Sequence, residues 1–429
     1  MSSDQIQVLD SRHIWHPFSQ AETGPAYPVA VKAQDSWIET ADGHRVLDLV
    51  SSWWVNLHGH GEPKIAAAIA ETAARMEQVI FADFTHAPAA RLAAGLAEAL
   101  PGDLSKIFYS DNGSTAVEVA LKMALQYFQL VGQPKRKRLL GFDQGYHGDT
   151  VGAMSVGHSS GYFRAWSGML FPVDMLPFPA TWENDDSIAA KETRALAALD
   201  AKLADDVAAV ILEPLIQGAG GMRFCRPEFV RQVAERVREA GVLLILDEVM
   251  TGFGRTGSLF ACQQADVVPD LICLSKGLTG GFLPMGATVA REGFCQAFTG
   301  QMLDRAFLHG HSYTANPLGC AAGLASLEIL TSPECERRRS AIETVQKERM
   351  SALAKRRPEL HARARGTIAA VDLAKGAYGD GSGARIKERF WREGMLIRPL
   401  GPVLYFLPPY CVTPEELHKA WDLLESSLG

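Results

Sequence analysis

The central part of the chain alternates short apolar runs with helical stretches, and this alternation constrains the fold more than any other feature. Residues 207–212, 242–246 and 271–274 are continuous apolar runs, which are typical of strands buried on both faces of a parallel sheet. Residues 227–240 are predicted to form a helix, with a proline near its start and Gly241 after its end. The alternation predicts an α/β fold with a mostly parallel sheet flanked by helices.

Polar residues follow several of the expected strands. Further strands are expected at residues 106–109, 139–142 and 285–290, and Thr115 with Glu118 predicts a T-x-x-E capping box at the start of a helix. The polar residues at the strand ends are 110–114, 143–149, Glu213, Asp247 and 275–276. Because ligands bind beyond the carboxyl ends of the strands in such sheets, this arrangement predicts a binding site there.

The two ends of the chain differ from its centre. Residues 36–50 predict a β-hairpin, and Thr413 begins a final helix with a capping box. We expect the two ends to pack together as a smaller α+β domain beside a large cofactor-binding domain. The expected boundaries are residues 1–60 for the N-terminal segment, 61–330 for the large domain and 331–429 for the C-terminal part.

Composition argues against several classes of function. The 429 residues carry a net charge of −7 at pH 7, whereas a dedicated nucleic-acid binder is basic. The seven cysteines contain no C-x-x-C pair, which is typical of reduced thiols rather than of disulfides or a metal site. No apolar run approaches the roughly 20 residues of a membrane span, and residues 1–10 lack the apolar core of a secretory signal. We therefore expect a soluble cytoplasmic protein without nucleic-acid, membrane or metal partners.

Two residues at strand ends suggest covalent chemistry. Lys276 follows an apolar strand, and desolvation lowers the pKa of an amine there, as a Schiff-base nucleophile requires. Asp247 ends another apolar run, where its carboxylate suits the cationic nitrogen of a heterocycle because a buried acid needs a partner. The structural alternatives are a lysine that reaches solvent and an aspartate that caps a turn.

Two further positions suit a phosphorylated, planar ligand. Gly113 and Ser114 stand at a helix start, where free N–H groups and the helix dipole favour a phosphate. Tyr146 follows a strand and offers a ring that can stack on a planar cofactor, with Asp149 near enough in sequence to orient it. A plain capped helix and a loop aromatic are the alternatives.

A substrate wall is suggested by the adjacent Trp53 and Trp54, which project to different sides, and by Arg398, whose guanidinium suits a carboxylate. Core packing and a surface ion pair are the alternatives. Each signal is weak alone. Together, a Schiff-base lysine, an acid, a phosphate cup and a stacking aromatic form the set that pyridoxal 5'-phosphate demands.

The run 247–257 (DEVMTGFGRTG), followed by Lys276, resembles the class III pyridoxal-phosphate aminotransferases of fold type I. Within them the chain is similar to the 7,8-diaminopelargonic acid aminotransferases of biotin synthesis, over nearly its whole length. The further matching segments are residues 15–17, 51–54, 146–150, 217–222, 397–399 and 407–410.

The resemblance implies roles for the cofactor residues. Lys276 is implied to hold the cofactor covalently, Asp247 to face its ring nitrogen, and Tyr146 to lie against the ring as a third catalytic residue. Gly113 and Ser114 are implied to form the phosphate cup. The cofactor implied is therefore pyridoxal 5'-phosphate.

The resemblance also implies a second subunit. Gly310, His311 and Ser312 are similar to a segment that reaches the phosphate of the neighbouring subunit's cofactor, which implies a homodimer with shared active sites. Arg255 either helps with a substrate carboxylate or holds the architecture of the site. The residues implied to contact substrate are Phe18, Trp53, Trp54, Arg255, Gly310 and Arg398.

The implied reaction is transamination of 8-amino-7-oxononanoate to 7,8-diaminononanoate. Phe18 stands where the best-known members carry tyrosine, and His311-Ser312 where they carry Pro-Thr. These differences resemble members that use lysine as amino donor. S-adenosylmethionine nevertheless remains the first choice of donor, and lysine is the second.

Lys276 is expected to act as general base once an amino donor displaces it, and one pocket serving two substrates in turn predicts ping-pong kinetics. Two other functions stay open. One is an ω-amino-acid aminotransferase with another ketone acceptor, and the other is a regulatory protein that binds the cofactor without catalysis.

Overall fold

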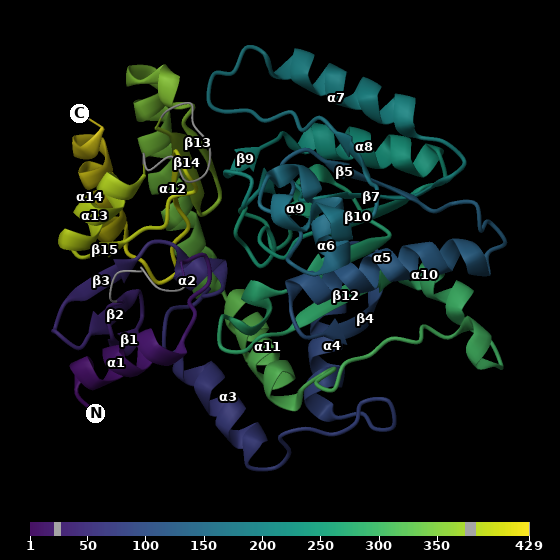
Figure 1. Ribbon diagram of the computed structural model, residues 1–429, viewed down its shortest axis with the longest axis horizontal. Helices are drawn as coiled ribbons and strands as arrows, with labels where there is room; N and C mark the ends of the chain where they lie inside the picture. Colours follow the sequence, from purple (N-terminus) through teal and green to yellow (C-terminus); the bar gives the residue numbers. More distant parts are fainter. Residues whose placement is uncertain (21–26, 374–382, 429) are drawn as a thin grey trace.

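The computed structural model describes residues 1–20, 27–373 and 383–428 (Figure 1). Its centre is a seven-stranded sheet in which every pairing is parallel except those of β12, which runs antiparallel to both of its neighbours. The predicted mostly parallel α/β sheet is confirmed. From one edge to the other, the strands are β4 (Leu104–Ser110), β12 (Gly286–Arg291), β11 (Leu271–Leu274), β10 (Leu243–Asp247), β7 (Val207–Leu212), β5 (Arg138–Phe142) and β6 (Asp174–Leu176).

Strand β10 shows why the central strands are apolar without interruption. Leu243 and Ile245 belong to the buried cluster that contains α5 (Gly113–Leu130), and Leu246 belongs to the cluster that contains α8 (Pro227–Glu239). Successive side chains of a strand point to opposite faces, and each fully buried Leu or Ile contributes about 1.5–3 kcal/mol. A strand covered on both faces therefore needs an apolar residue at every position.

Further helices cover the sheet and its edges. Helix α4 packs against β4, α7 packs against α8, and α11 packs against α3 and α4. The bounds are α3 (Pro63–Ala73), α4 (Ala87–Ala99), α6 (Val151–Val156), α7 (Ile188–Lys202), α9 (Ala261–Ala265), α10 (Glu292–Cys295) and α11 (Pro317–Leu330).

The start of α5 differs from the predicted T-x-x-E box. Asn112 is the N-cap, and its side chain accepts from the Thr115 backbone N–H at 3.0 Å while the Thr115 hydroxyl accepts from the Asn112 backbone N–H. Glu118 instead accepts from the backbone N–H of Gly152 at 2.6 Å. The prediction was wrong because Asn112 is itself a strong capping residue one turn earlier.

A smaller group of elements comes from both ends of the chain. The hairpin predicted at residues 36–50 is confirmed, and its second strand pairs in parallel with β15 from the C-terminal part. The predicted capping box of the last helix is also confirmed, between Thr413 and Glu416. These elements are α1 (Ser3–His13), β1 (Ala30–Gln34), β2 (Trp37–Thr40), β3 (Arg45–Asp48), α2 (Ser51–Trp54), α12 (Pro333–Arg356), β13 (Arg363–Arg365), β14 (Ile368–Asp372), α13 (Ala384–Arg392), β15 (Met395–Leu396), β16 (Val403–Phe406) and α14 (Pro414–Ser427).

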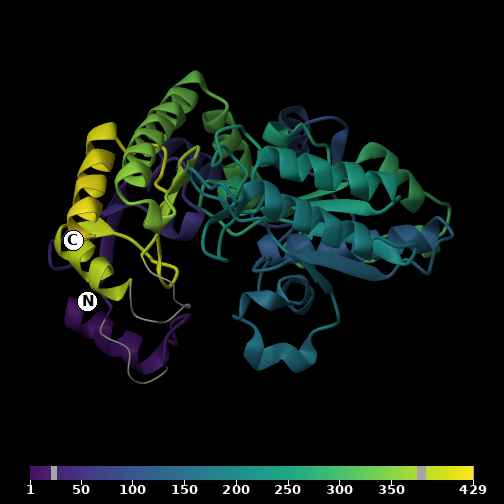
Figure 2. The same ribbon diagram turned by 90° about the horizontal axis from the view of Figure 1, so that it is seen from above.

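Figure 2 places the purple N-terminal elements beside the yellow C-terminal ones, away from the teal central sheet. The shared sheet of β3 and β15 supports the proposed division at residues 60 and 330, which stays a prediction. All seven cysteines are free thiols. Within the described ranges, no helix combines the length and apolarity that crossing a membrane requires.

Candidate active site

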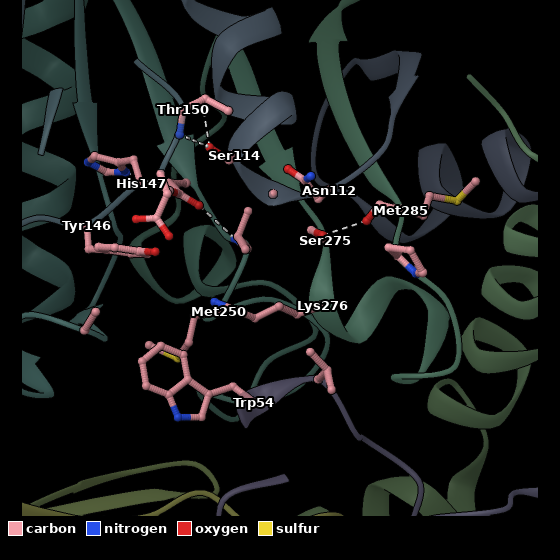
Figure 3. Close-up of a pocket in the computed structure, with 18 of the residues that line it drawn as sticks. Trp54, Asn112, Ser114, Tyr146, His147, Thr150, Met250, Ser275, Lys276 and Met285 are labelled. Carbon is pink, nitrogen blue, oxygen red and sulfur yellow. Dashed lines mark hydrogen bonds and ion pairs between the residues drawn. The ribbon is translucent and has the colours of Figure 1, made fainter. Parts of the chain in front are cut away.

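A cavity of about 620 Å³ opens at the carboxyl edge of the central sheet (Figure 3). Its walls come from the ends of β10 and β11, from the start of α5 and from α2. The lining includes Trp54, Ser114, Tyr146, His147, Asp247 and Lys276. With Gly113, which also lines the cavity, the structure therefore gathers six of the predicted site residues in one place, together with His147.

Lys276 lies one residue beyond Ser275, which follows β11, and it begins a short 3₁₀ turn, Lys276–Thr279, in a left-handed conformation with φ of 45°. Its ammonium nitrogen lies 4.8 Å from the centre of the Trp54 ring. Burial lowers the pKa of Lys276, and the nearby Arg255 lowers it further, while Asp247 and Glu213 oppose the shift. A lowered pKa increases the neutral fraction of the amine, which is the nucleophilic form.

The segment that carries Lys276 is closed at both ends. The next strand, β12, runs antiparallel to β11, so the chain returns to the same edge of the sheet. The Ser275 hydroxyl donates to the Met285 carbonyl at 2.6 Å across the base of this loop (Figure 3). The lysine is thereby held against the cavity.

Asp247 is paired with His147 in the cavity floor. Nδ1 of His147 lies 2.6 Å from Oδ2 of Asp247, and the backbone N–H of Val249 donates to Oδ1 at 3.0 Å. Burial disfavours a charged imidazole, but the hydrogen bond and negative charge of Asp247, with Glu213 nearby, raise the pKa of His147. The imidazolium therefore gives Asp247 a hydrogen-bonded, positively charged partner in a site where only 4% of the Asp247 surface is exposed.

Glu213 supports the same floor. It follows β7, and its carboxylate accepts from the backbone N–H of Tyr146 at 3.0 Å and of Gly218 at 2.8 Å. Burial, helped by the charge of Asp247, raises the pKa of Glu213 to about 7, although His147 opposes the shift. Glu213 thus fixes the loop that carries the predicted stacking tyrosine.

Glu248, although adjacent to Asp247, faces away from the cavity. Its carboxylate accepts from the backbone N–H groups of Ala261 at 2.6 Å and Cys262 at 2.8 Å, at the start of α9. Burial raises the pKa of Glu248 to about 7. Of this acidic pair, only Asp247 is available to a ligand.

The start of α5 forms another wall. The Ser114 hydroxyl accepts from the backbone N–H of Thr150 at 3.0 Å and lies 2.7 Å from the Thr150 hydroxyl (Figure 3). The first N–H groups of an 18-residue helix lie here, and they favour an anion. A Cβ at Gly113 would lie 2.7 Å from Cγ1 of Val249, so packing against Val249 also requires glycine there.

Tyr146 reaches the cavity from the loop after β5, with its ring roughly parallel to that of Phe163 at 5.9 Å. Burial is the main cause that raises the pKa of Tyr146. The negative charge of Asp149 and its hydrogen bond with Tyr146 raise this pKa further. Its hydroxyl therefore stays protonated at neutral pH. Figure 3 shows the tyrosine ring on one side of the cavity and the Trp54 ring below it.

Trp53 and Trp54 lie on a left-handed turn. All residues of α2, Ser51–Trp54, have positive φ, with values of 50°, 43°, 69° and 75°. Each left-handed residue that is not glycine costs roughly 1–2 kcal/mol. Trp54 is buried and donates from Nε1 to the Tyr405 hydroxyl at 2.9 Å, whereas Trp53 is 37% exposed.

Trp53 belongs to an outer group with two other predicted substrate residues. The Arg398 guanidinium lies 4.1 Å from the centre of the Trp53 ring. The centre of the Phe18 ring lies 5.3 Å from the centre of the Trp53 ring. Phe18 is exposed. An apolar surface beside a guanidinium suits a chain that ends in a carboxylate.

Arg255 does not line the cavity. It is 1% exposed and donates to the carbonyls of Pro408 at 2.9 Å, Asn56 at 2.9 Å and Trp54 at 3.3 Å. These partners come from both ends of the chain. Of the two predicted roles, the structure therefore favours holding the architecture over contact with substrate.

Gly310, His311 and Ser312 also lie outside the cavity of their own chain. Nδ1 of His311 lies 3.2 Å from Oδ2 of Asp111, and the Ser312 carbonyl accepts from the Gln78 side chain at 2.8 Å. A single chain therefore does not bring this segment to Lys276.

The sequence matches the family model described as "Aminotransferase class-III" over residues 18–428. This chain belongs to the class-III aminotransferases. The resemblance drawn from its motifs is confirmed.

Curated relatives of this class-III aminotransferase share a name. A protein of Synechococcus elongatus called adenosylmethionine-8-amino-7-oxononanoate aminotransferase is 52% identical, and the match covers 96% of this chain and 98% of the relative. A protein of the same name from Geobacter sulfurreducens is 38% identical, with coverage of 99% and 97%.

Solved structures agree. The adenosylmethionine-8-amino-7-oxononanoate aminotransferase of Methanocaldococcus jannaschii superposes with a TM-score of 0.91 at 32% identity, covering 100% of this chain and 99% of that one. An amine transaminase from an uncultivated Pseudomonas species, in its PLP-bound form, gives 0.90 at 30% identity, with coverage of 97% and 98%.

His147, Thr150 and Glu213 of this class-III aminotransferase were given no individual role by the sequence, although His147 and Glu213 were among the strand-end polar residues that predicted a site there. His147 and Thr150 belong to the matching segment at residues 146–150, which was the available signal, and Glu213 follows an apolar strand. Their contacts join positions far apart in sequence, which the sequence alone does not reveal.

The His147–Asp247 pair predicts a pH-dependent stability. Because the pKa of His147 is raised above 6.5 on folding, its contribution is fully present below pH 6.5 and is lost as pH rises through the raised value. His147→Gln keeps a donor but removes the charge, so it should lower the unfolding free energy by about 1.5–3 kcal/mol at low pH and by less at high pH. Thermal unfolding of both proteins across pH measures this, and a difference that grows with pH contradicts the assignment.

Arg255→Met separates the two roles of that residue. Methionine removes all three hydrogen bonds that the guanidinium donates to buried carbonyls. At roughly 1 kcal/mol for each bond, the unfolding free energy should fall by about 3 kcal/mol. Denaturant unfolding measures the loss. A variant that keeps wild-type stability but binds the carboxylate substrate weakly would instead assign Arg255 to substrate.

Proposed function

We propose that this chain transfers an amino group to 8-amino-7-oxononanoate, giving 7,8-diaminononanoate in biotin synthesis, with pyridoxal 5'-phosphate as cofactor. The observation that carries the proposal is the 52% identity over 420 residues to a relative of that name. S-adenosylmethionine is the proposed donor and lysine the alternative. A cytoplasmic location is proposed as well, because seven cysteines without a C-x-x-C pair suit a reducing compartment.

The residues of the cavity fit pyridoxal 5'-phosphate. The start of α5 with Ser114 offers N–H donors to the phosphate, Asp247 suits the ring nitrogen, Tyr146 suits a ring face, and Lys276 suits the aldehyde. The cavity volume of about 620 Å³ is ordinary for a cofactor site. When bound, the cofactor supplies an electron-withdrawing ring that accepts the electron pair released at the substrate carbon.

Lys276 would move the proton in both halves of the reaction. Its lowered pKa provides a neutral Nζ that accepts the proton from the donor's carbon and later returns one to the acceptor's carbon. The ion pair of Asp247 with His147 would keep a carboxylate opposite the ring nitrogen. Trp54 closes the cavity beside Nζ and limits access of water.

The outer group of Phe18, Trp53 and Arg398 would bind the acceptor's far end. The Arg398 guanidinium pairs with the carboxylate of the nine-carbon chain, and the two rings cover its methylene groups. Donor and acceptor occupy the same cavity in turn, so the kinetics are expected to be ping-pong.

We also propose a homodimer with shared sites. Large apolar side chains are exposed along the segment that contains Gly310–Ser312 and along a neighbouring loop, including Leu308 at 74%, Tyr313 at 63% and Phe84 at 62%. Exposed apolar patches of this kind mark interfaces. Light scattering on the purified protein should give twice the 46.6 kDa chain mass, and a monomer active at the same concentration contradicts the shared site.

Turnover of 8-amino-7-oxononanoate, with S-adenosylmethionine and with lysine, is the direct test of the function. We expect diamine product with at least one of them, and Lys276→Ala should abolish it together with the visible absorbance of the bound cofactor, because no other amine replaces Nζ. Turnover of other ketone acceptors alone, in an amine–ketone panel, would establish the ω-amino-acid aminotransferase instead. A protein that binds the vitamer but converts no donor is the regulatory alternative.

Arg398→Ala should raise the KM for 8-amino-7-oxononanoate by about 10- to 100-fold, because a hydrogen-bonded charge pair is worth roughly 1.5–3 kcal/mol. The rate at saturating acceptor should change little. Arg392→Ala is the matched control, since that arginine lies on α13 with 69% of its side chain exposed. An unchanged KM in the Arg398 variant removes that residue from acceptor binding.

A further inference from the structure

Asp48 forms a buried hydrogen-bond hub outside the cavity. It ends β3 and is 0% exposed. Its Oδ1 accepts from the backbone N–H of Val50 at 3.0 Å, and its Oδ2 accepts from the backbone N–H of Ser52 at 2.7 Å and the Ser52 hydroxyl at 3.0 Å. Nε2 of His60 lies 3.1 Å from the same Oδ2. Four donors thus converge on one carboxylate.

Most of these donors belong to the left-handed turn or to the residue before it. The turn Ser51–Trp54 contains no glycine, and its own backbone preference favours the opposite hand. Strained backbone of this kind persists only where the surroundings over-determine it. The Ser51 hydroxyl adds a bond of 2.7 Å to the Leu407 carbonyl on the other side.

The left-handed turn determines where two neighbouring indoles lie. Trp54 faces inward and lines the cavity beside Lys276, whereas Trp53 faces outward to Arg398 and Phe18. The inner and outer parts of the substrate path therefore depend on the same few backbone angles. Within the described residues the hydrogen bonds of Asp48 go to Val50, Ser52 and His60 and not to either indole, so we argue its influence on substrate through the turn.

We propose that Asp48 is a positioning residue for the acceptor: it holds the left-handed turn so that Trp53 and Trp54 form the outer and inner walls of one substrate path. The proposal rests on the proposed function, because it takes the acceptor to lie along both indoles. It predicts that weakening the hub loosens acceptor binding while leaving Lys276, Asp247 and the start of α5 in place.

Ser52→Gly separates this role from a merely structural one. Glycine adopts a φ of 43° without the penalty that serine has, but it removes the hydroxyl bond to Asp48. The melting temperature should therefore stay equal or rise, while the KM for 8-amino-7-oxononanoate increases about tenfold, which corresponds to 1.4 kcal/mol. The maximal rate and the absorbance of the bound cofactor should change little.

Asp48→Asn is the second variant, since an amide accepts fewer of the four donors. It should raise the KM further and lower the melting temperature. Asp266→Gly is the matched control, because Asp266 is an exposed left-handed residue, with φ of 55°, at the end of α9. That change should raise the melting temperature and leave the KM unchanged.

The experiment combines steady-state kinetics with calorimetric binding of nonanoate, an inert carboxylate of the acceptor's length, to the protein with and without cofactor. We expect nonanoate binding to weaken in the Ser52 and Asp48 variants and not in the control. The proposal is overturned if the Ser52 and Asp48 variants both bind nonanoate with wild-type affinity. It is also overturned if, across the two variants and the control, KM rises only where the melting temperature falls. A wild-type enzyme that does not convert 8-amino-7-oxononanoate would instead overturn the proposed function.

Discussion

The buried guanidinium of Arg255 joins the three parts of the chain from which the site is built. Its own segment follows β10, while its acceptor carbonyls belong to Trp54 and Asn56 near the N-terminus and to Pro408 near the C-terminus. No carboxylate pairs with it among the ion pairs of the described residues, so its charge is met by main-chain dipoles and by the Tyr410 ring. The cavity depends on this junction, since Trp54, whose carbonyl accepts from Arg255, lines it.

The neighbouring acids Asp247 and Glu248 have different partners because their side chains leave the end of β10 in opposite directions. Asp247 faces the cavity and pairs with His147, whereas Glu248 caps α9 on the opposite side. Successive residues at the end of a strand point to opposite faces. The acidic dipeptide therefore places one carboxylate in the cavity and the other at the start of α9, and neither can take the position of the other.

Much of the sheet was predictable because strands that are buried on both faces appear in the sequence as uninterrupted apolar runs. The polar residues after β10 and β11 were predictable for a related reason, since parallel strands end at one edge. The pairing of His147 with Asp247 joins residues 100 positions apart, and pattern alone does not specify such a pair. The left-handed turn gave no signal, because Ser-Ser-Trp-Trp lacks the glycine that usually marks positive φ. The cap of α5 was misplaced because two residues in one loop were each suited to it.

The reversed direction of β12 constrains how this part of the gene can vary. Because β11 ends and β12 begins at the same edge, the loop that carries Lys276, residues 275–285, is tied at its base by the hydrogen bond between Ser275 and Met285. Because both ends of this loop are fixed, a residue added beside Lys276 would shift the amine relative to Asp247 and His147. Insertions and deletions are therefore expected to be excluded from residues 275–285, whereas exposed loops far from this edge can change length freely.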